Sequence, residues 1–155
     1  MAWRIPDRRD IAATLNQKEL DEFRAHPDFL SDADPVADLI KRTAELVRGY
    51  IRDGRRRNRN VSMSPHAYEI PESLISPAVD YAAYDVLKRL PLGINEDRKN
   101  ARQAALDLFK EVANGNYTPE PYTPDGEAGD ESAGLALPSF GTPRRKILNE
   151  YPQLM

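Results

Sequence analysis

Apolar side chains recur every three to four residues in three long stretches of the chain, which predicts three long helices. Each stretch follows a side chain that can cap a helix, and each ends at a glycine or a proline. The predicted helices cover residues 35–54, 77–90 and 96–114, with N-caps at Asp34, Ser76 and Asn95 and stop signals at Gly54, Pro91 and Gly115. The first two helices also have a proline at their first position, where its missing N–H is tolerated.

The middle helix is the one that we expect the others to cover. Ala82 and Ala83 have small side chains at the middle of this helix, so a neighbouring helix can approach closely. Gly49, in the preceding helix, is a candidate for a close contact between helices. The helical spacing predicts a core made of ten apolar residues: Val36, Leu39, Ile40, Val47, Val79, Ala82, Val86, Leu87, Leu108 and Val112.

Two short helices are expected before the long ones. Asp7 can cap the first, and Asn16 and Glu19 have the spacing of a capping box for the second, which covers residues 17–25. The pair His26-Pro27 stops that helix, because a residue before proline avoids the helical region. Residues 3–6 are expected to be extended, and residues 61–68 to form a loop or a short hairpin arm. The fold class is therefore all-α, a small bundle of about five helices.

The composition of the chain changes after Gly115. Residues 116–155 hold six of the 13 prolines and four of the 8 glycines, without a helical or alternating period. This predicts two parts, a helical domain over 1–115 and an extended C-terminal docking arm over 116–155. The alternative is that the arm wraps its own helices. The arm regains apolar and basic positions that we expect to dock on a partner: Phe140, Arg144, Arg145, Lys146, Ile147, Leu148, Tyr151 and Leu154.

A basic loop over residues 52–60 is predicted at the end of the first long helix. Residues 52–60 contain five arginines against one aspartate, a local charge of +4 in a chain whose net charge is −3. The five arginines are Arg52, Arg55, Arg56, Arg57 and Arg59. Arginine binds DNA phosphates well through paired donors, but such a segment also bonds acidic groups of a neighbouring subunit or stays in solvent. The negative net charge argues against a dedicated nucleic-acid binder.

Residue types that carry chemistry are few and scattered. The chain has no cysteine, and His26 and His66 lie far apart without a metal-binding motif. Both histidines are expected to be solvent-exposed loop residues. It has neither a phosphate-binding glycine loop nor a nucleophile motif, and Asp80 and Asp85 are expected to be surface or interface charges. We expect no enzyme, cofactor or metal. No apolar run reaches the roughly 18 residues of a membrane span, and the N-terminus does not read as a secretory signal.

Four groups of residues carry a resemblance to a known family. They are Asp10-Ile11 with Leu15, the run Ala44–Ile51, the segments Pro71–Leu74 and Asp80–Leu87, and the closing run Ala104–Gly115. Their order resembles the small helical head–tail connector, or head-completion, adaptors of tailed phages, prophages and gene transfer particles, and in particular the Mu-type family of virion proteins. The resemblance covers residues 4 to about 117. The arginine-rich segment and the tail after Tyr117 depart from the family pattern.

The resemblance implies a structural virion protein at the head–tail interface, assembled in the host cytoplasm. Adaptors of this kind form a homo-oligomeric ring, commonly twelve-fold, between the portal protein and a tail-proximal stopper or tail-terminator protein. Packaged double-stranded DNA passes through the lumen of the ring. The alternative from another class is a DNA-binding or terminase-associated packaging module, which the arginine-rich segment would also suit.

Overall fold

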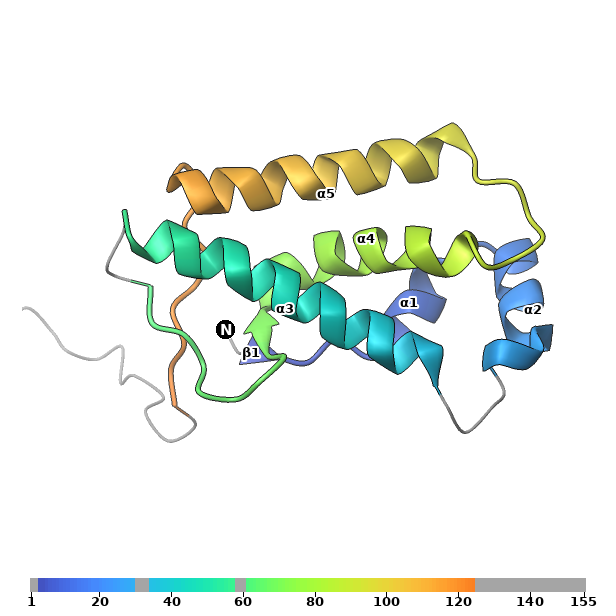
Figure 1. Ribbon diagram of the computed structural model, residues 1–155, viewed down its shortest axis with the longest axis horizontal. Coiled ribbons are helices and arrows are strands. Elements are labelled where there is room, and N and C mark those ends of the chain that lie inside the picture. Colours follow the sequence, from blue (N-terminus) through green and yellow to red (C-terminus); the bar gives the residue numbers. More distant parts are fainter. Residues whose placement is uncertain (1–2, 30–33, 58–60, 125–155) are drawn as a thin grey trace, which may run out of the picture. The chain divides into compact units, whose positions relative to one another are not determined.

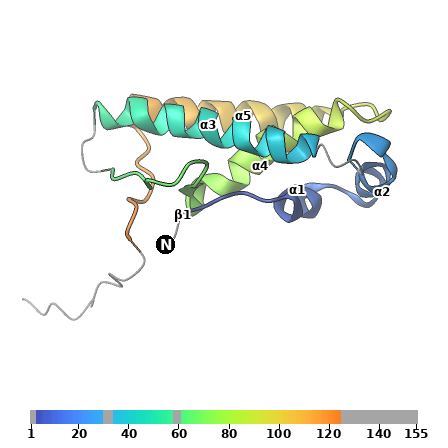
Figure 2. The ribbon, with the colours of Figure 1, turned by 60° about the horizontal axis from the view of Figure 1, so that its bottom comes forward.

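Helix α4, Ile75–Leu87, lies at the centre of the helical domain, as the sequence pattern predicts (Figure 1). The computed structural model describes residues 3–29, 34–57 and 61–124. Within them, α4 packs against α1 (Arg8–Thr14), α3 (Pro35–Arg55) and α5 (Glu96–Asn114), and α3 and α5 also pack on each other. Figure 2 shows α3 and α5 together on one side of α4, with α1 on the other side. The prediction of an all-α bundle of five helices is confirmed.

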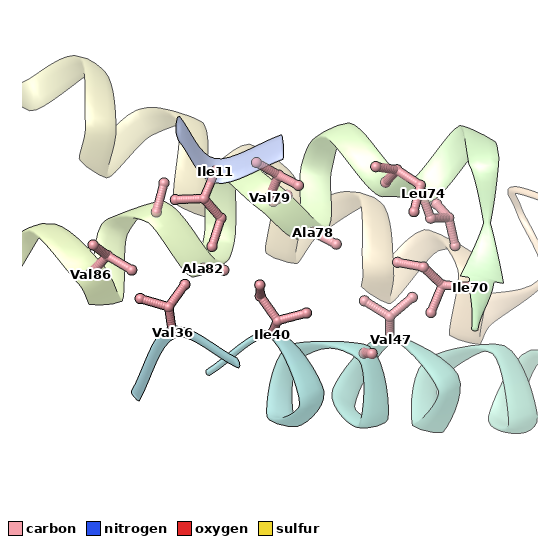
Figure 3. Close-up of a cluster of buried hydrophobic side chains, with 14 of the residues drawn as sticks. Ile11, Val36, Ile40, Val47, Ile70, Leu74, Ala78, Val79, Ala82 and Val86 are labelled. Atoms are coloured by element: carbon pink, nitrogen blue, oxygen red, sulfur yellow. The ribbon is translucent and has the colours of Figure 1, made fainter. Parts of the chain in front are cut away.

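The core lies where α3 faces α4. Figure 3 shows Val36 and Ile40 of α3 pointing toward Ala82 and Val86 of α4. Ala82 is only 3% exposed, so neighbouring elements pack closely against the small side chains at the middle of this helix, as predicted. Eight of the ten predicted core residues are buried, and the two others, Leu39 and Leu108, are half-buried and packed against the core.

The buried face of α5 is displaced from the prediction. Phe109, which the sequence pattern did not single out, is fully buried, and its ring lies 5.9 Å from that of Tyr50 and 6.4 Å from that of Tyr81. Ala104 is exposed, whereas the next residue, Ala105, is buried. The pattern of small residues along α5 fits two neighbouring faces equally well. The Phe109 ring fills the space between the three long helices, and its burial determines which face of α5 is turned inward.

The two short helices begin and end as their caps predict. Asp7 caps α1 by accepting hydrogen bonds from the backbone N–H groups of Arg9 and Asp10. Asn16 and Glu19 form the predicted capping box of α2, which spans Gln17–Ala25. A short 3-10 helix, η1 (Pro27–Phe29), follows and buries the Phe29 ring against the core. Caps are local interactions between residues two or three apart, which is why the sequence predicts them well.

The start and end of α4 differ from the prediction. Ser76 is not its N-cap, because the 3-10 helix η2 (Glu72–Leu74) runs directly into α4 and supplies the Glu72 carbonyl for the first bond. Regular α-helix ends at Leu87 rather than Leu90. Two tighter turns then carry the chain to Leu90, whose N–H donates to the Leu87 carbonyl.

A short antiparallel pair ties the N-terminus to the segment before α4. Strand β1 (Trp3–Arg4) pairs with β2 (Ile70–Pro71), with Trp3 opposite Pro71 and Arg4 opposite Ile70. The preceding residues 61–68 form a loop, one of the two alternatives for this segment, and they bury Val61 and Ser64.

Candidate functional site

The C-terminal end of α3 carries four of the five predicted contact arginines. Arg52 and Arg55 lie in the last turn of the helix, and Arg56 and Arg57 follow it directly. The prediction of a loop starting at Arg52 is therefore wrong at its beginning. Cations are favoured at the carboxyl end of a helix, where unpaired carbonyls carry partial negative charge. The fifth arginine, Arg59, lies outside the described residues.

Helix α3 continues one residue past Gly54, its predicted stop signal. Gly54 is buried in the last turn of α3, and a Cβ atom built there would lie 2.3 Å from the backbone oxygen of Val112 in α5. By contrast, a Cβ atom at Gly49, the glycine predicted to allow close packing, meets nothing within 4 Å. The close contact between helices is therefore at Gly54 and not at Gly49. Gly54 is the close-contact residue that brings the ends of α3 and α5 together.

Arg57 has a structural contact, unlike its neighbours. Its Nη1 atom donates to the backbone oxygen and to the side-chain oxygen of Asn114, each at 3.2 Å. Next to this contact α5 ends at Gly115, whose φ of 79° lies in the left-handed region that glycine adopts without strain. Arg57 therefore helps to hold the end of α3 against the end of α5.

Arg52, Arg55 and Arg56 are exposed and have no ion pair within the described residues. We call these three residues the arginine end of α3. They are one to four positions apart on a well-formed helical turn, so their charges are concentrated on a rigid support. A surface of this kind is suited to phosphates or carboxylates of a partner.

A groove of about 450 Å³ lies beside the arginine end and is lined by Glu45, Arg48, Arg52, Pro65, Ala67 and Tyr68. Arg48 is fixed in its wall by hydrogen bonds from its guanidinium to the carbonyls of Glu69, at 2.7 Å, and Ser64, at 2.9 Å. The same guanidinium lies over the Trp3 ring. Burial and the nearby charge of Arg52 lower the pKa of Arg48. No sequence pattern singles out Arg48 as a site residue, because its partners are carbonyls of a distant loop.

The first residues after α5 pack on the helical domain. The Trp3 indole N–H donates to the carbonyl of Glu120 at 3.1 Å, and the Glu120 carboxylate accepts from the backbone N–H and the hydroxyl of Ser73. Tyr122 donates its N–H to the Ser62 carbonyl at 3.0 Å and accepts from the Ser62 hydroxyl at 2.7 Å. The compact unit thus includes residues 116–124, beyond the predicted boundary at 115.

Glu120 is a half-buried anchor that the sequence pattern does not reveal. Burial raises the pKa of this carboxyl, but the two hydrogen bonds from Ser73 outweigh burial, and the pKa lies below its ordinary value. All eight predicted docking residues of the arm lie outside the described residues: Phe140, Arg144, Arg145, Lys146, Ile147, Leu148, Tyr151 and Leu154. Their contacts stay a prediction.

The described part of the chain contains no group of three or more histidine, aspartate or glutamate side chains placed to hold a metal ion. His66 is exposed, as predicted, whereas His26 is half-buried with its ring 5.3 Å from that of Phe29. Among the described helices, none is both long and apolar enough to cross a membrane.

Comparisons with known proteins identify no relative. No protein-family model, no curated protein and no solved structure matches the chain.

Proposed function

We propose that the chain is a structural adaptor subunit of a tailed phage or phage-like particle, and that it works by assembly rather than by catalysis. In this proposal, copies form a ring, twelve-fold as the family resemblance implies, between the portal and the tail-proximal protein. Packaged double-stranded DNA passes through the lumen. The resemblance over residues 4 to about 117 supports this proposal, and the bundle of three long helices suits a ring wall.

The observation that carries the proposal is the position of the arginine end. The ends of α3 and α5 meet there through Gly54 and Arg57 (Figure 1). The segment that follows α5 is hydrogen-bonded to Ser62, which comes a few residues after the arginine end in the sequence. Both segments expected to contact partners therefore start from one end of the helical domain. One end of each subunit can then contact partners while the helices pack side by side.

The same arginines also favour the rival function, a DNA-binding or terminase-associated packaging module. The two functions differ in how tightly a single subunit must bind DNA through these arginines. An adaptor in a ring contacts DNA weakly and many times, because each subunit contributes a few phosphate contacts around the lumen. A free DNA-binding module must bind duplex DNA tightly as a monomer or a small oligomer.

The mass of the purified chain and a gel shift with duplex DNA separate the two functions. The adaptor proposal predicts a large closed oligomer, alone or with the portal protein, and only weak, salt-sensitive binding of DNA by the free subunit. A monomer or dimer that binds duplex DNA tightly without the portal, and that does not associate with it, would establish the rival function instead.

A further inference from the structure

A second hollow, of about 220 Å³, lies between α4 and α5. We call it the α4–α5 groove. Its walls are mostly apolar and built from small side chains, and they include one ionisable group. The lining residues are Ser76, Pro77 and Asp80 of α4 and Ala101, Ala104, Ala105 and Leu108 of α5.

Asp80 is half-buried in this groove, and no hydrogen bond or ion pair to it is found within the described residues. The cation whose charge acts on Asp80 is Arg98, whose guanidinium is already bonded to the Glu19 carboxylate at 2.6 Å and to the Thr14 carbonyl at 2.7 Å. Burial raises the pKa of Asp80, and the charge of Arg98 opposes this only in part. A carboxylate without donors in an apolar hollow costs free energy, which a cationic donor from a partner would offset.

The groove has a chemical match in the chain itself. The segment Arg144–Leu148 presents three cations followed by two branched apolar side chains, in the order RRKIL. Its cations suit Asp80, and Ile147 and Leu148 suit walls made of alanine and leucine side chains. Nineteen residues separate Pro124, where the described chain ends, from Arg144. Fully extended, such a length spans at most about 70 Å, enough to reach a neighbouring subunit in a ring.

We infer that the α4–α5 groove is a docking site for the Arg144–Leu148 segment of a second copy of this chain. The inference rests on the proposed function, since a ring of identical subunits needs a head-to-tail contact between two different surfaces of the same chain. The groove supplies one surface and the basic segment supplies the other. Each contact is small, and repetition around a closed ring strengthens the whole.

Cross-linking of the full-length chain tests the contact directly. A photo-reactive amino acid is placed at position 104, where Ala104 is exposed at the rim of the groove. Chains with this residue, carrying the ordinary isotopes, are mixed with ¹⁵N-labelled chains without it, and cross-linked peptides are identified by mass spectrometry. The inference predicts cross-links from position 104 to residues 140–154 of a ¹⁵N chain. Cross-links only within one chain, to other segments, or none at all would overturn it.

Charge exchange tests the role of Asp80. Asp80→Lys, and the milder Asp80→Asn should the lysine variant not fold, are expected to reduce the cross-links about tenfold, as for loss of one charge pair worth about 1.4 kcal/mol. The matched control is Glu111→Lys, which makes the same charge change at an exposed site of α5. Replacing Arg144, Arg145 and Lys146 by aspartate in the partner chain is expected to restore cross-links to the Asp80→Lys chain. No loss in the Asp80 variants, or an equal loss in the control, would contradict the assignment.

The outcome separates this inference from the proposed function. If the Asp80 variants and the arm variants still form rings that bind the portal protein, the adaptor proposal stands and the groove is not the docking site. If the wild-type chain neither oligomerises nor binds the portal protein, the adaptor proposal itself fails.

Discussion

Two groups of arginines in this domain are used in opposite ways. Arg4, Arg8 and Arg98 each join elements distant in the sequence, whereas the arginine end of α3 contacts no carboxylate within the described residues. Arg4 pairs with Asp10 at 2.7 Å and with Glu72 at 2.9 Å. The Arg98 and Glu19 side chains, 16% and 10% exposed, form the most buried ion pair described.

The difference shows which charges stabilise the fold and which are available to partners. A buried pair such as Arg98 with Glu19 is costly to break, because the remaining charge is left without its partner. Exposed arginines on a helix end contribute little to stability, so their clustering needs another explanation. Isolated charges are common on protein surfaces, but three arginines within residues 52–56, at the end of a well-packed helix, form a defined surface for anions.

The largest effect is expected at Gly54, which positions the arginine end against α5. Gly54→Ala places a Cβ atom against the Val112 carbonyl, and since both groups are part of packed helices, the ends must separate. We expect a loss of about 2–3 kcal/mol in the free energy of unfolding, measured by chemical denaturation. The matched control is Gly49→Ala, with open space around it, which should stabilise α3 by up to about 1 kcal/mol. Equal effects at the two glycines would contradict the assigned packing.

The next largest effect is expected at the ion pair of Arg98 with Glu19. Glu19→Gln should lower the free energy of unfolding at neutral pH by about 2 kcal/mol, because Arg98 loses its charged partner. Asp107→Asn, in an exposed pair with Lys110, is the control and should cost less than about 0.5 kcal/mol. A cost at Glu19 no larger than at Asp107 would show that the buried pair does not stabilise the fold.

The Glu19 effect should depend on pH. Burial raises the pKa of Glu19, but hydrogen bonds from Arg98 and from the Asn16 N–H outweigh burial, so the folded pKa lies below its ordinary value. The contribution of a carboxyl with a lowered pKa is present above the unfolded pKa and is lost as pH falls through the folded pKa. The difference between wild type and Glu19→Gln should therefore shrink on acidification below about pH 4.

The contribution of Asp80 to stability should depend on pH in the opposite way from that of Glu19, because the pKa of Asp80 is raised. Its ionised form opposes folding above the folded pKa, and this cost disappears as pH falls below the unfolded pKa. Asp80→Asn is expected to leave stability at pH 7 unchanged or to raise it by less than about 1 kcal/mol. Thermal unfolding at pH 7 and pH 3 checks this, and a clear loss of stability in the variant would show that Asp80 has a partner within its own domain.

The smallest effect on stability is expected at the arginine end. Replacing Arg52, Arg55 and Arg56 by glutamine should change the free energy of unfolding by less than about 0.5 kcal/mol and leave oligomerisation intact. The loss should appear in DNA contact, whose salt dependence should weaken because fewer counterions are released. Arg57 is excluded from this variant since it bonds Asn114. Loss of oligomerisation instead would make these arginines a bridge between subunits.

The sequence predicted the local features of the fold and missed those that depend on how helices cross. The caps at Asp7, Asn16 and Asn95 involve neighbours two or three residues apart, so their signals are local. The close contact predicted at Gly49 lies at Gly54 instead, because which glycine meets another helix depends on the crossing point of α3 and α5.

The same limit applies to the candidate site. The sequence identified the cluster of arginines, but it could not separate Arg57 from its neighbours, since the partner Asn114 lies 57 residues away. Arg48 was missed because its partners are backbone carbonyls, which leave no pattern in a sequence. Which charges are paired is thus a property of the fold and is not visible in the sequence.

Imaging of particles purified from a strain that encodes this chain tests the central claim most directly. The account predicts a ring of this chain between the portal and the tail, with Arg52, Arg55 and Arg56 facing the packaged DNA. Particles that lack the chain at this junction, or rings in which these arginines are buried against carboxylates of adjacent subunits, would contradict it.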